Sequence, residues 1–554
     1  MNRRSWAERG GALLLGLAAF LLVVGPAPLD PTNIAWLSEA DAATNYLGWA
    51  FFRASPWGWP PAANPSYGLD IAGSVMMADA NPLMALPFKL LGPILPTPFQ
   101  YFGWWLLLCF LLQGLFAHAI ARKLTPHVEQ RLAIALLFLF TPFFLIRIAT
   151  PAVFHMTLVG QWQILAALFL YLSPDLRRRA LWWAALLAVA VLTHPYLLAL
   201  VAAIWLADIF RALIAAREAP RTILLGAVLG PAAAFAVARL SGVFWLQGAG
   251  IDTANAGTMS VEWGFAIYKA NLLTAIDPGG WSLFLPDIAT KPEQIEGFAY
   301  LGLGVLLLAV AAVAAGGRLR PKLRLDRQHW PLAIILAGCA LFSLSNHVEM
   351  GGHMLSLPWP APLVGIGNMF RSTGRFVWPV AYVVMLIIMW GVAKGWRRPF
   401  ASSLLAVAAL VQIIDSSAGW SAYAETFARR GAAWPTGLQS RFWDEAKGRY
   451  RAIGLIVPRN HAPFYRDLNM WALDQGMGSG ITYLARYDRG ALDRLTQLRA
   501  HQFTSGSLPR DTLWITDGVP ADRLAGMRRT SGDFVGTVDG IPLFAPGFAA
   551  RPAR

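Results

Sequence analysis

Long apolar runs alternate with shorter stretches rich in arginine and lysine over the first three quarters of the chain. Several runs approach the roughly 20 residues that a helix needs to cross about 30 Å of hydrocarbon. The pattern predicts about eleven membrane-spanning helices. Basic clusters such as 177–179, 318–324 and 394–398 follow alternate spans, and the positive-inside rule assigns them to the cytoplasm. We therefore expect a cytoplasmic N-terminus and a C-terminus on the outer side.

Three large loops on the outer side connect the predicted spans, at residues 29–98, 244–295 and 346–376. Within the first loop, residues 76–91 are expected to form a helix that lies on the membrane surface. Two of the spans flank His194, and the other nine are predicted near residues 11–26, 99–120, 132–146, 155–172, 223–243, 297–315, 331–344, 377–392 and 401–414.

From residue 416 the composition becomes that of a soluble domain. Residues 450–457 and 512–517 read as buried strands, and residues 463–476 read as a helix between them. Residues 534–546 are typical of a hairpin, with Asp539-Gly540 at its turn. We therefore predict an α-helical polytopic membrane domain over residues 1–415 and a small α/β domain over residues 416–554.

Composition and charge support a membrane protein and exclude some other classes. The chain has 554 residues, 56% of them hydrophobic, and a net charge of +15. Because its lysines and arginines are spread between the apolar runs, we expect no nucleic-acid partner. Two cysteines, Cys109 and Cys339, both lie in apolar runs, so neither a disulfide framework nor a zinc site is expected. The first apolar run could also serve as a signal peptide, but an uncleaved helix is the better interpretation.

The predicted topology places unusual polar residues on one side of the membrane. All of them fall in outer loops or at the outer ends of spans, and a water-filled cavity facing outward would accommodate them. They are Glu39, Asp41, Asp79, Arg147, His155, His194, Lys269, Glu296, Arg371 and Arg375.

Three carboxylates in the first outer loop are candidate catalytic residues. Asp41 can accept a proton from an attacking hydroxyl, or bind a divalent cation such as Mg²⁺ or Mn²⁺. The alternative is that Asp41 caps the N-terminus of a helix over residues 42–53, a position that aspartate favours. Glu39 and Asp79 are weaker candidates, and a solvated loop or a cap explains them as well.

Arg371 and Arg375 precede a span on the outer side, where the positive-inside rule disfavours arginine. Two guanidinium groups there can bind a phosphate bidentately, and Arg147 is a further candidate for this role. Interfacial snorkelling or pairing with loop carboxylates remains the alternative. Four other residues, whose polar groups could contact a substrate, complete the candidate set: His155, His194, Lys269 and Glu296. The alternatives are that Glu296 pairs with the dipole at the N-terminus of the next span and that the backbone satisfies His155.

The chain resembles the GT-C class of membrane glycosyltransferases in its first outer loop with Glu39 and Asp41, its many spans and its outer C-terminal domain. Three segments, around residues 41–49, 296–302 and 370–376, resemble more closely a bacterial family known mainly as a domain of unknown function. The GT-C resemblance implies a lipid-phosphate sugar donor and transfer on the outer side of the membrane. It also implies that Asp41 is the catalytic carboxylate and that Arg371 and Arg375 hold the donor phosphate. The chain departs from many GT-C enzymes at residues 147–151, where no carboxylate occurs.

The sequence thus predicts a glycosyltransferase in the bacterial inner membrane, with its C-terminal domain in the periplasm. The donor would be a sugar linked to polyprenyl phosphate, and the acceptor an envelope glycan, a lipid or a protein. One alternative is a transporter or flippase for lipid-linked sugars, which would need a path through the membrane and broken helices near its midplane. Another is a non-catalytic assembly protein of an envelope-polysaccharide complex.

Overall fold

The computed structural model describes residues 3–549, apart from 70, 72, 149–153, 175, 216–218, 243–264, 289, 317–326, 485, 486, 488 and 528. The predicted basic cluster at 318–324 and the first part of the predicted loop 244–295 lie outside the described residues.

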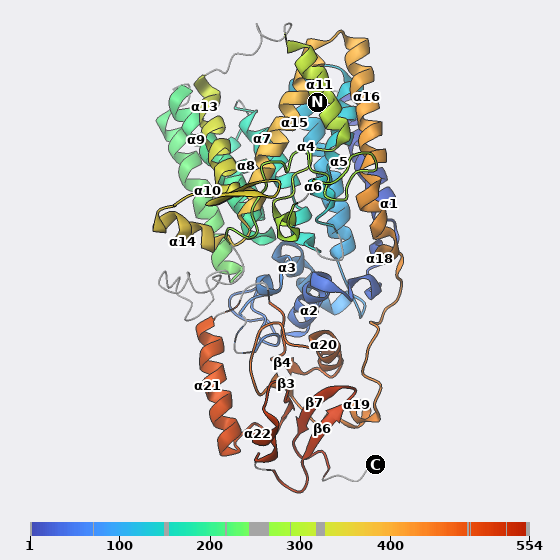
Figure 1. Ribbon diagram of the computed structural model, residues 1–554, viewed down its shortest axis with the longest axis vertical. Coiled ribbons are helices and arrows are strands. Elements are labelled where there is room, and N and C mark those ends of the chain that lie inside the picture. The colour runs from blue at the N-terminus through green and yellow to red at the C-terminus, as the bar shows by residue number, and fades with distance from the viewer. Residues whose placement is uncertain are drawn as a thin grey trace. The chain divides into compact units, whose positions relative to one another are not determined.

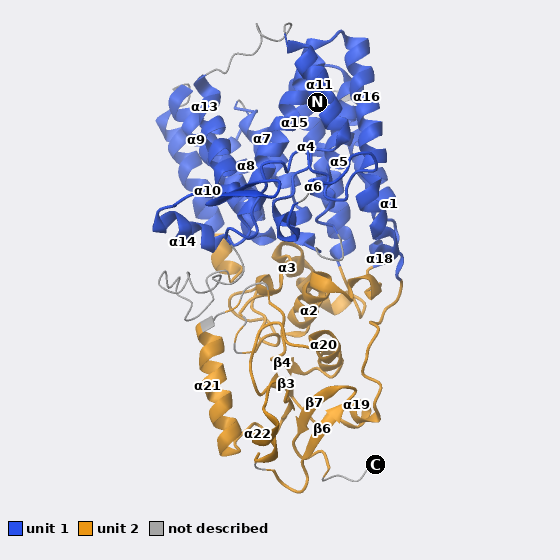
Figure 2. Ribbon diagram, viewed as in Figure 1, with its two compact units in different colours: residues 1–30, 101–235, 253–429 blue, residues 31–100, 236–252, 430–554 orange. Residues whose placement is uncertain are grey.

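The chain divides into two compact units, and each is built from segments that are distant in sequence (Figure 2). Unit 1 comprises Met1–Asp30, Tyr101–Phe235 and Thr253–Arg429, and unit 2 comprises Pro31–Gln100, Ala236–Asp252 and Arg430–Arg554. Most of the first predicted outer loop therefore belongs to the same unit as the C-terminal segment. The predicted domains, 1–415 and 416–554, stay a prediction.

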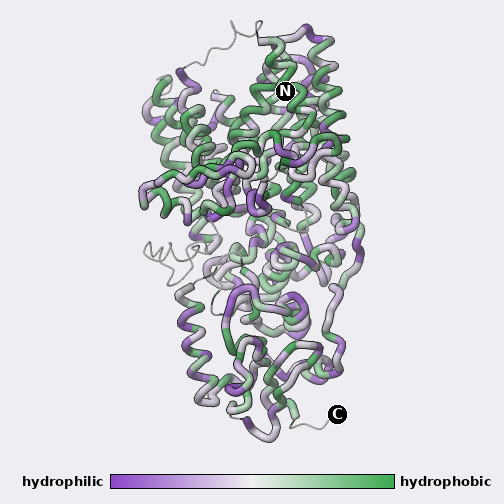
Figure 3. The backbone as a smooth tube through the Cα atoms, viewed as in Figure 1, coloured by the Kyte–Doolittle hydropathy of each residue, from purple (hydrophilic) through white to green (hydrophobic). Residues whose placement is uncertain are grey.

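Unit 1 is helical, and its helices pack on one another (Figure 1). For example, α1 packs against α4, α4 against α5 and α7, and α11 against α15 and α16. Figure 3 shows that hydrophobic residues dominate these helices. The helices are α1 Arg3–Val23, α4 Phe102–Leu124, α5 Val128–Leu139, α6 Pro142–Leu145, α7 Trp162–Tyr171, α8 Arg179–Thr193, α9 Pro195–Ala215, α10 Pro220–Leu240, whose last turn belongs to unit 2, α11 Leu303–Ala314, α13 Trp330–Leu344, α14 Ala361–Met369, α15 Val377–Gly395, α16 Arg398–Asp415, α17 Ser417–Trp420 and α18 Ala424–Ala428.

Six helical segments among the described residues are long and apolar enough to cross a membrane, so the prediction of about eleven spans was too high. They are Trp6–Val23, Phe102–Leu124, Pro195–Ala215, Pro220–Leu240, Thr373–Gly395 and Arg398–Ala428. The apolar helices Met156–Tyr171, Arg179–Thr193 and Leu303–Ala314 are shorter.

The predicted span 132–146 shows one physical reason for the lower count. Its apolar run is continuous, but α5 ends at Leu139 and the short α6 begins at Pro142. Proline lacks the N–H that would continue the helix, and its ring disfavours helical backbone in the preceding residue. The run therefore holds two short helices, neither of which can cross the bilayer alone.

Buried polar side chains join several helices of unit 1. Gln113 Nε2 donates to the Tyr382 hydroxyl at 2.9 Å, and this hydroxyl donates to Gln161 Oε1 at 2.7 Å. Gln161 Nε2 donates in turn to the Phe143 carbonyl at 3.0 Å. In an apolar surrounding these groups must bond to each other, so they fix the helices in register.

The connections between the helices of unit 1 contain short regular elements. Strands β1 His347–Met350 and β2 His353–Ser356 form an antiparallel hairpin in which His347 pairs with Ser356. Two 3₁₀ helices, η6 Pro292–Gly297 and η8 Thr373–Phe376, lie against each other. These two turns carry the central residues of the candidate site.

Unit 2 is an α/β structure with a five-stranded sheet in the order β4-β3-β5-β7-β6. β3 pairs in parallel with β4 and β5, whereas β7 pairs antiparallel with β5 and β6. The C-terminal α/β prediction is confirmed, with Asp539 and Gly540 at the hairpin turn in left-handed backbone. The elements are α2 Ala40–Ala54, α3 Pro82–Leu90, α19 Arg441–Glu445, β3 Ala452–Leu455, α20 Tyr465–Asp474, β4 Gly478–Ser479, α21 Arg489–Ser505, β5 Thr512–Ile515, α22 Ala521–Ala525, β6 Phe534–Val538 and β7 Ile541–Ala545.

Residues from the start of the chain form part of the core of unit 2. The Trp434 indole donates to the Ile34 carbonyl at 2.9 Å, and its ring packs on Tyr46 with the centroids 5.6 Å apart. The surface helix predicted at 76–91 is instead the 3₁₀ helix Val75–Ala78 followed by α3. Asp79 and Asn81 have positive φ between these helices, which interrupts regular helix there.

Candidate functional site

A buried cluster in unit 1 is centred on Glu296. Glu296 lies in η6, and Arg375 lies in η8, which packs on η6. Arg147 follows α6, and His155 immediately precedes the 3₁₀ turn Met156–Val159. Four residues predicted separately from the sequence are thereby brought together.

The Glu296 carboxylate binds two guanidinium groups through the same oxygen. Arg147 Nη1 donates to Oε2 at 2.9 Å, and Arg375 Nε donates to Oε2 at 2.8 Å. Arg147 Nη2 also donates to the carbonyls of Ile295 at 2.7 Å and Glu296 at 3.2 Å. His155 Nδ1 lies 4.0 Å from the other oxygen, Oε1. Arg147 is therefore fixed to both the side chain and the backbone of η6.

Both guanidinium groups also lie on aromatic rings. The Arg147 guanidinium is 5.1 Å from the centre of the Trp378 ring, and that of Arg375 is 4.4 Å from the centre of the Tyr196 ring. Arg147 is fully buried, and Arg375 is 6% exposed. Cation–π contacts of this kind strengthen when water is excluded, so they offset part of the cost of burying the charges.

Burial and charge act in opposite directions on Glu296. Burial alone raises the pKa of the Glu296 carboxyl, but the positive charges of Arg375 and Arg147 hold it well below its usual range. Burial lowers the pKa of the half-buried His155 to about 3; the Glu296 carboxylate opposes this shift, and the two arginines add to it. At neutral pH the cluster therefore holds one negative carboxylate, two positive guanidinium groups and a neutral imidazole.

Glycine is required where η6 meets η8. A Cβ added to Gly297 would lie 2.4 Å from the Ala270 Cα, and one added to Gly374 would lie 2.6 Å from the Gly297 Cα. The Gly374 N–H donates to the Tyr268 carbonyl at 2.9 Å. Gly297 follows Glu296, and Gly374 precedes Arg375. These two glycines thus allow the close approach of the turns that sets the spacing of the Glu296 and Arg375 side chains.

Two other predicted residues lie beside this cluster. Arg371 is exposed, and its guanidinium is 5.2 Å from the centre of the Tyr268 ring. His194 stacks on Tyr196, the ring that carries Arg375. The Tyr196 hydroxyl accepts a hydrogen bond from the Ser372 N–H at 2.8 Å and donates to the Phe370 carbonyl.

Lys269 instead pairs with Glu349, a residue that the sequence did not single out. Lys269 Nζ lies 3.5 Å from Glu349 Oε2, and Lys291 Nζ lies 2.5 Å from Oε1. Gln294, from η6, donates to the same carboxylate. Glu349 is 1% exposed and joins hairpin β1–β2 to the segment that carries Glu296. A carboxylate just beyond a predicted span was the signal available in the sequence.

The predicted catalytic carboxylates belong to unit 2. The N-cap of α2 is Glu39, whose side chain makes no capping hydrogen bond, so the alternative interpretation, that Asp41 is the N-cap, was wrong. Asp41 lies in the first helical turn, where its charge also suits the helix dipole. Glu39 is exposed, Asp41 is half-buried, and Asp79 is the half-buried C-cap of the turn Val75–Ala78. The catalytic roles of these carboxylates stay predictions.

A bound cation also stays a prediction. Among the described residues, no group of three or more His, Cys, Asp and Glu side chains is placed to hold a metal ion. Asp41 could offer its carboxylate oxygens, which suit Mg²⁺ or Mn²⁺.

The fold and the buried cluster together define a helical membrane protein with a small α/β unit. Comparison with protein families then identifies the chain more closely. Residues 13–417 match the family described as a domain of unknown function, DUF6311, and residues 442–546 match the DUF6311 C-terminal domain. The chain belongs to this family, so the resemblance to a family of unknown function is confirmed. No glycosyltransferase family matches. No curated protein and no solved structure matches.

Proposed function

We propose that this protein is a membrane glycosyltransferase that takes its sugar from a polyprenyl-phosphate donor. The donor phosphate binds at the Glu296 cluster, and the sugar passes to an envelope glycan, lipid or protein acceptor. The proposal includes transfer at the periplasmic face of the bacterial inner membrane. The proposed reaction class, sugar transfer from a lipid-phosphate donor, follows from the resemblance to GT-C enzymes.

One observation carries the proposal: two buried guanidinium groups face a single carboxylate. A buried positive charge is costly unless an anion compensates it. The Nε of Arg147 is buried and has no hydrogen-bond acceptor among the described residues. A phosphate group offers both negative charge and several acceptor oxygens, and arginine binds it through more than one N–H.

The chemistry follows from the charges. As the bond between the sugar and the phosphate breaks, negative charge grows on the leaving phosphate, and fixed guanidinium groups stabilise that charge. Glu296 holds the arginines in place, so little reorganisation is needed when the charge appears. As the new glycosidic bond forms, the proton of the acceptor hydroxyl passes to a general base, the role for which the sequence predicts Asp41. The exposed Arg371 gives the donor phosphate its first positive contact.

Transfer in proteoliposomes tests the proposal. The purified full chain receives polyprenyl-phosphate glucose, mannose, galactose or arabinose with a radiolabelled sugar, and extracted bacterial envelope material serves as acceptor. We expect Arg375→Gln to lower transfer at least about 100-fold, because the leaving phosphate loses a fixed charge. Arg375→Lys keeps the charge without the planar fork and should retain part of the activity.

The matched control is Arg398→Gln, which breaks an exposed ion pair with Glu129. This control should transfer like the wild type. Thermal unfolding in detergent shows whether each variant is folded. Equal transfer by folded Arg375→Gln and the wild type would place the phosphate elsewhere. If the wild-type protein transfers no sugar from any donor but moves the donor across the bilayer, the protein is a flippase.

A further inference from the structure

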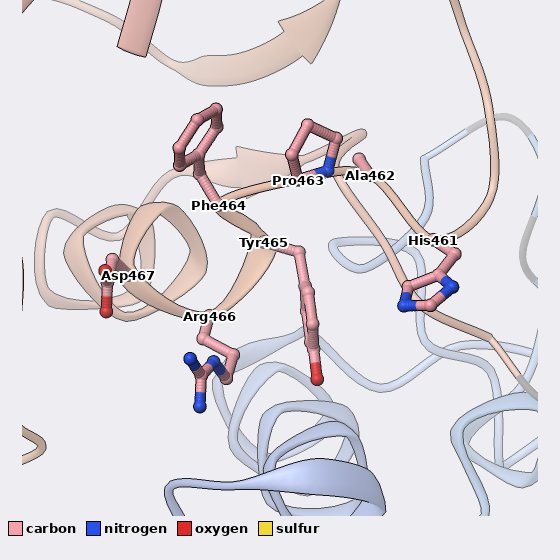
Figure 4. Close-up of a pocket in the computed structure, with 7 residues that line it drawn as sticks. All are labelled: His461, Ala462, Pro463, Phe464, Tyr465, Arg466 and Asp467. Carbon is pink, nitrogen blue, oxygen red and sulfur yellow. The ribbon is translucent and has the colours of Figure 1, made fainter. Parts of the chain in front are cut away.

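A cleft of about 410 Å³ in unit 2 is lined by residues 461–467, at the start of α20 (Figure 4). The side chains of His461, Tyr465 and Arg466 extend to one side of this segment, and those of Pro463 and Phe464 extend to the other. The Tyr465 hydroxyl reaches the first turn of α2, where it donates to the Ala40 carbonyl at 3.4 Å. The cleft thus lies next to the turn that carries Asp41.

Aromatic rings form one part of this site. The exposed His461 imidazole stacks on the Tyr483 ring, with the centroids 4.1 Å apart and the planes at 16°. Tyr465 meets the same Tyr483 ring edge-on at 5.8 Å. Such a surface offers a flat apolar face with polar groups at its rim, and the C–H face of a pyranose ring packs well on it.

Hydrogen-bond donors and acceptors, including one positive and one negative side chain, lie near the rings. Arg466 is exposed, and its Nη1 donates to the Ser38 carbonyl at 2.9 Å. Burial raises the pKa of the Tyr465 hydroxyl, and the nearby Asp41 carboxylate adds to this rise, so the hydroxyl stays protonated as a donor. Asp467, another lining residue, supplies a carboxylate. Mixed donors and acceptors suit sugar hydroxyls better than they suit an anion.

The backbone of the cleft is held in a defined conformation. His461 and Phe464 have φ values of 59° and 61°, in the left-handed region that most residues avoid. The His461 N–H donates to the Thr482 carbonyl at 2.9 Å, and Asn460 exchanges two hydrogen bonds with the backbone of Leu484. The aromatic surface is therefore pre-formed, which reduces the entropic cost of binding a ligand.

We propose that this cleft binds a pyranose unit of a carbohydrate chain, with the sugar ring against His461 and Tyr465 and its hydroxyls bonded to Arg466 and Asp467. The assignment of this carbohydrate as the acceptor glycan rests on the proposed glycosyltransferase function. The binding of carbohydrate itself is independent of that function.

Saturation-transfer NMR on the full chain in detergent tests the proposal, with maltotriose, cellotriose and chitotriose at millimolar concentration as probes. We expect saturation of the protein to reach the ring protons of at least one trisaccharide. His461→Ala and Arg466→Ala should each weaken its binding by about tenfold, through loss of the ring and of the hydrogen bonds. His501→Ala and Arg523→Ala are matched controls, because both residues are exposed in other helices of unit 2.

The outcomes separate this proposal from the proposed function. Wild-type protein that binds none of the three trisaccharides would overturn the carbohydrate site, whatever its transfer activity. Equal binding by the wild type and by folded His461→Ala and Arg466→Ala would show that sugars bind elsewhere. If Arg375→Gln loses transfer but still binds the trisaccharide, the two sites act separately, as we expect. If the cleft binds sugar and the wild type transfers none, only the glycosyltransferase proposal fails.

Discussion

At the scale of single residues, Glu296 sets the charge balance of the cluster in unit 1. It lies between two buried guanidinium groups and holds both through one oxygen. Breaking a buried ion pair by removing one partner commonly costs about 3–5 kcal/mol, because the remaining charge stays buried. The Glu296 carboxylate therefore supports the proposed phosphate site and should also contribute to the stability of unit 1.

The stability of the protein should fall in mild acid. Glu296 has a depressed pKa in the folded chain, so its ionised form contributes stability above about pH 4.5 that is lost as the pH falls towards the folded value. His155 stays neutral when folded, because its pKa drops from 6.5 to about 3. Below pH 6.5 the unfolded chain therefore binds a proton that the folded chain does not. The melting temperature in detergent should be constant above about pH 7 and fall below it.

Two histidine variants separate these contributions. His155→Gln should flatten the decline between pH 6.5 and 4.5, where one proton changes the free energy of unfolding by at most about 1.4 kcal/mol per pH unit. The side chain of His155 is 23% exposed, which reduces this slope. His353→Gln, at an exposed site in β2, should leave the wild-type decline unchanged. A decline that is identical in His155→Gln and wild type would assign it to other groups.

The sequence predicted the candidate residues of this cluster better than their pairing. Arginine on the outer side and a carboxylate at the start of a predicted span were visible as unusual positions. Arg147 and Glu296, however, are 149 positions apart, and no local pattern relates them. Glu349 was missed because its position just beyond a predicted span, although unusual, does not by itself distinguish a buried ion-pair partner from a solvated carboxylate in an outer loop.

At the scale of elements, the contact between η6 and η8 depends on Gly297 and Gly374. Alanine at either position would push the turns apart, since the added Cβ would approach main-chain atoms at 2.4–2.6 Å. We expect Gly297→Ala or Gly374→Ala to destabilise the protein by about 1–3 kcal/mol and to lower sugar transfer. Thermal unfolding and the proteoliposome assay measure the two effects.

Gly338→Ala is the control for the glycine variants. Nothing lies within 4 Å of the Cβ that this change would add in α13, and alanine favours the helix. We expect stability equal to or slightly above that of the wild type. Wild-type stability and transfer in Gly297→Ala and Gly374→Ala would mean that the two turns can separate without disturbing Glu296 and Arg375.

Hydrophobic runs predicted where helices occur, but not how long they are. A helix lies at each predicted span because the apolar runs are bounded by basic or proline-containing stretches. The length of an apolar run did not predict the length of a helix near Pro142, where one unbroken run holds two short helices. In the C-terminal segment, the period of two and the Asp539-Gly540 turn predicted the hairpin, because both signals are local.

At the scale of the whole molecule, the predicted topology can be measured by cysteine labelling. The two native cysteines are buried, so they should give little background. Lys123→Cys lies in the exposed basic end of α4, and Thr504→Cys lies on the exposed surface of α21. In spheroplasts we expect an impermeant maleimide to label Thr504→Cys at once and Lys123→Cys only after permeabilisation. The reverse pattern would invert the topology and move the proposed reaction to the cytoplasmic face.

Sequence patterns did not predict which segments of the chain form unit 2. A composition shift near residue 416 predicted a soluble C-terminal domain, yet residues 31–100 belong to the same compact unit. The bond between the Trp434 indole and the Ile34 carbonyl joins segments 400 positions apart. Contacts of this kind depend on the tertiary fold, which the local periodicity of the sequence does not predict.

This arrangement has a consequence for biosynthesis. Within unit 2, residues 31–100 leave the ribosome first, and their partner segment, which begins at Arg430, follows after most of the helices of unit 1. At about 5–20 residues per second, the delay is roughly 20 to 70 seconds. Throughout that time Tyr46, buried in the finished protein, lacks the Trp434 ring that packs on it. The nascent loop therefore needs protection from proteases and from aggregation until the last quarter of the chain arrives.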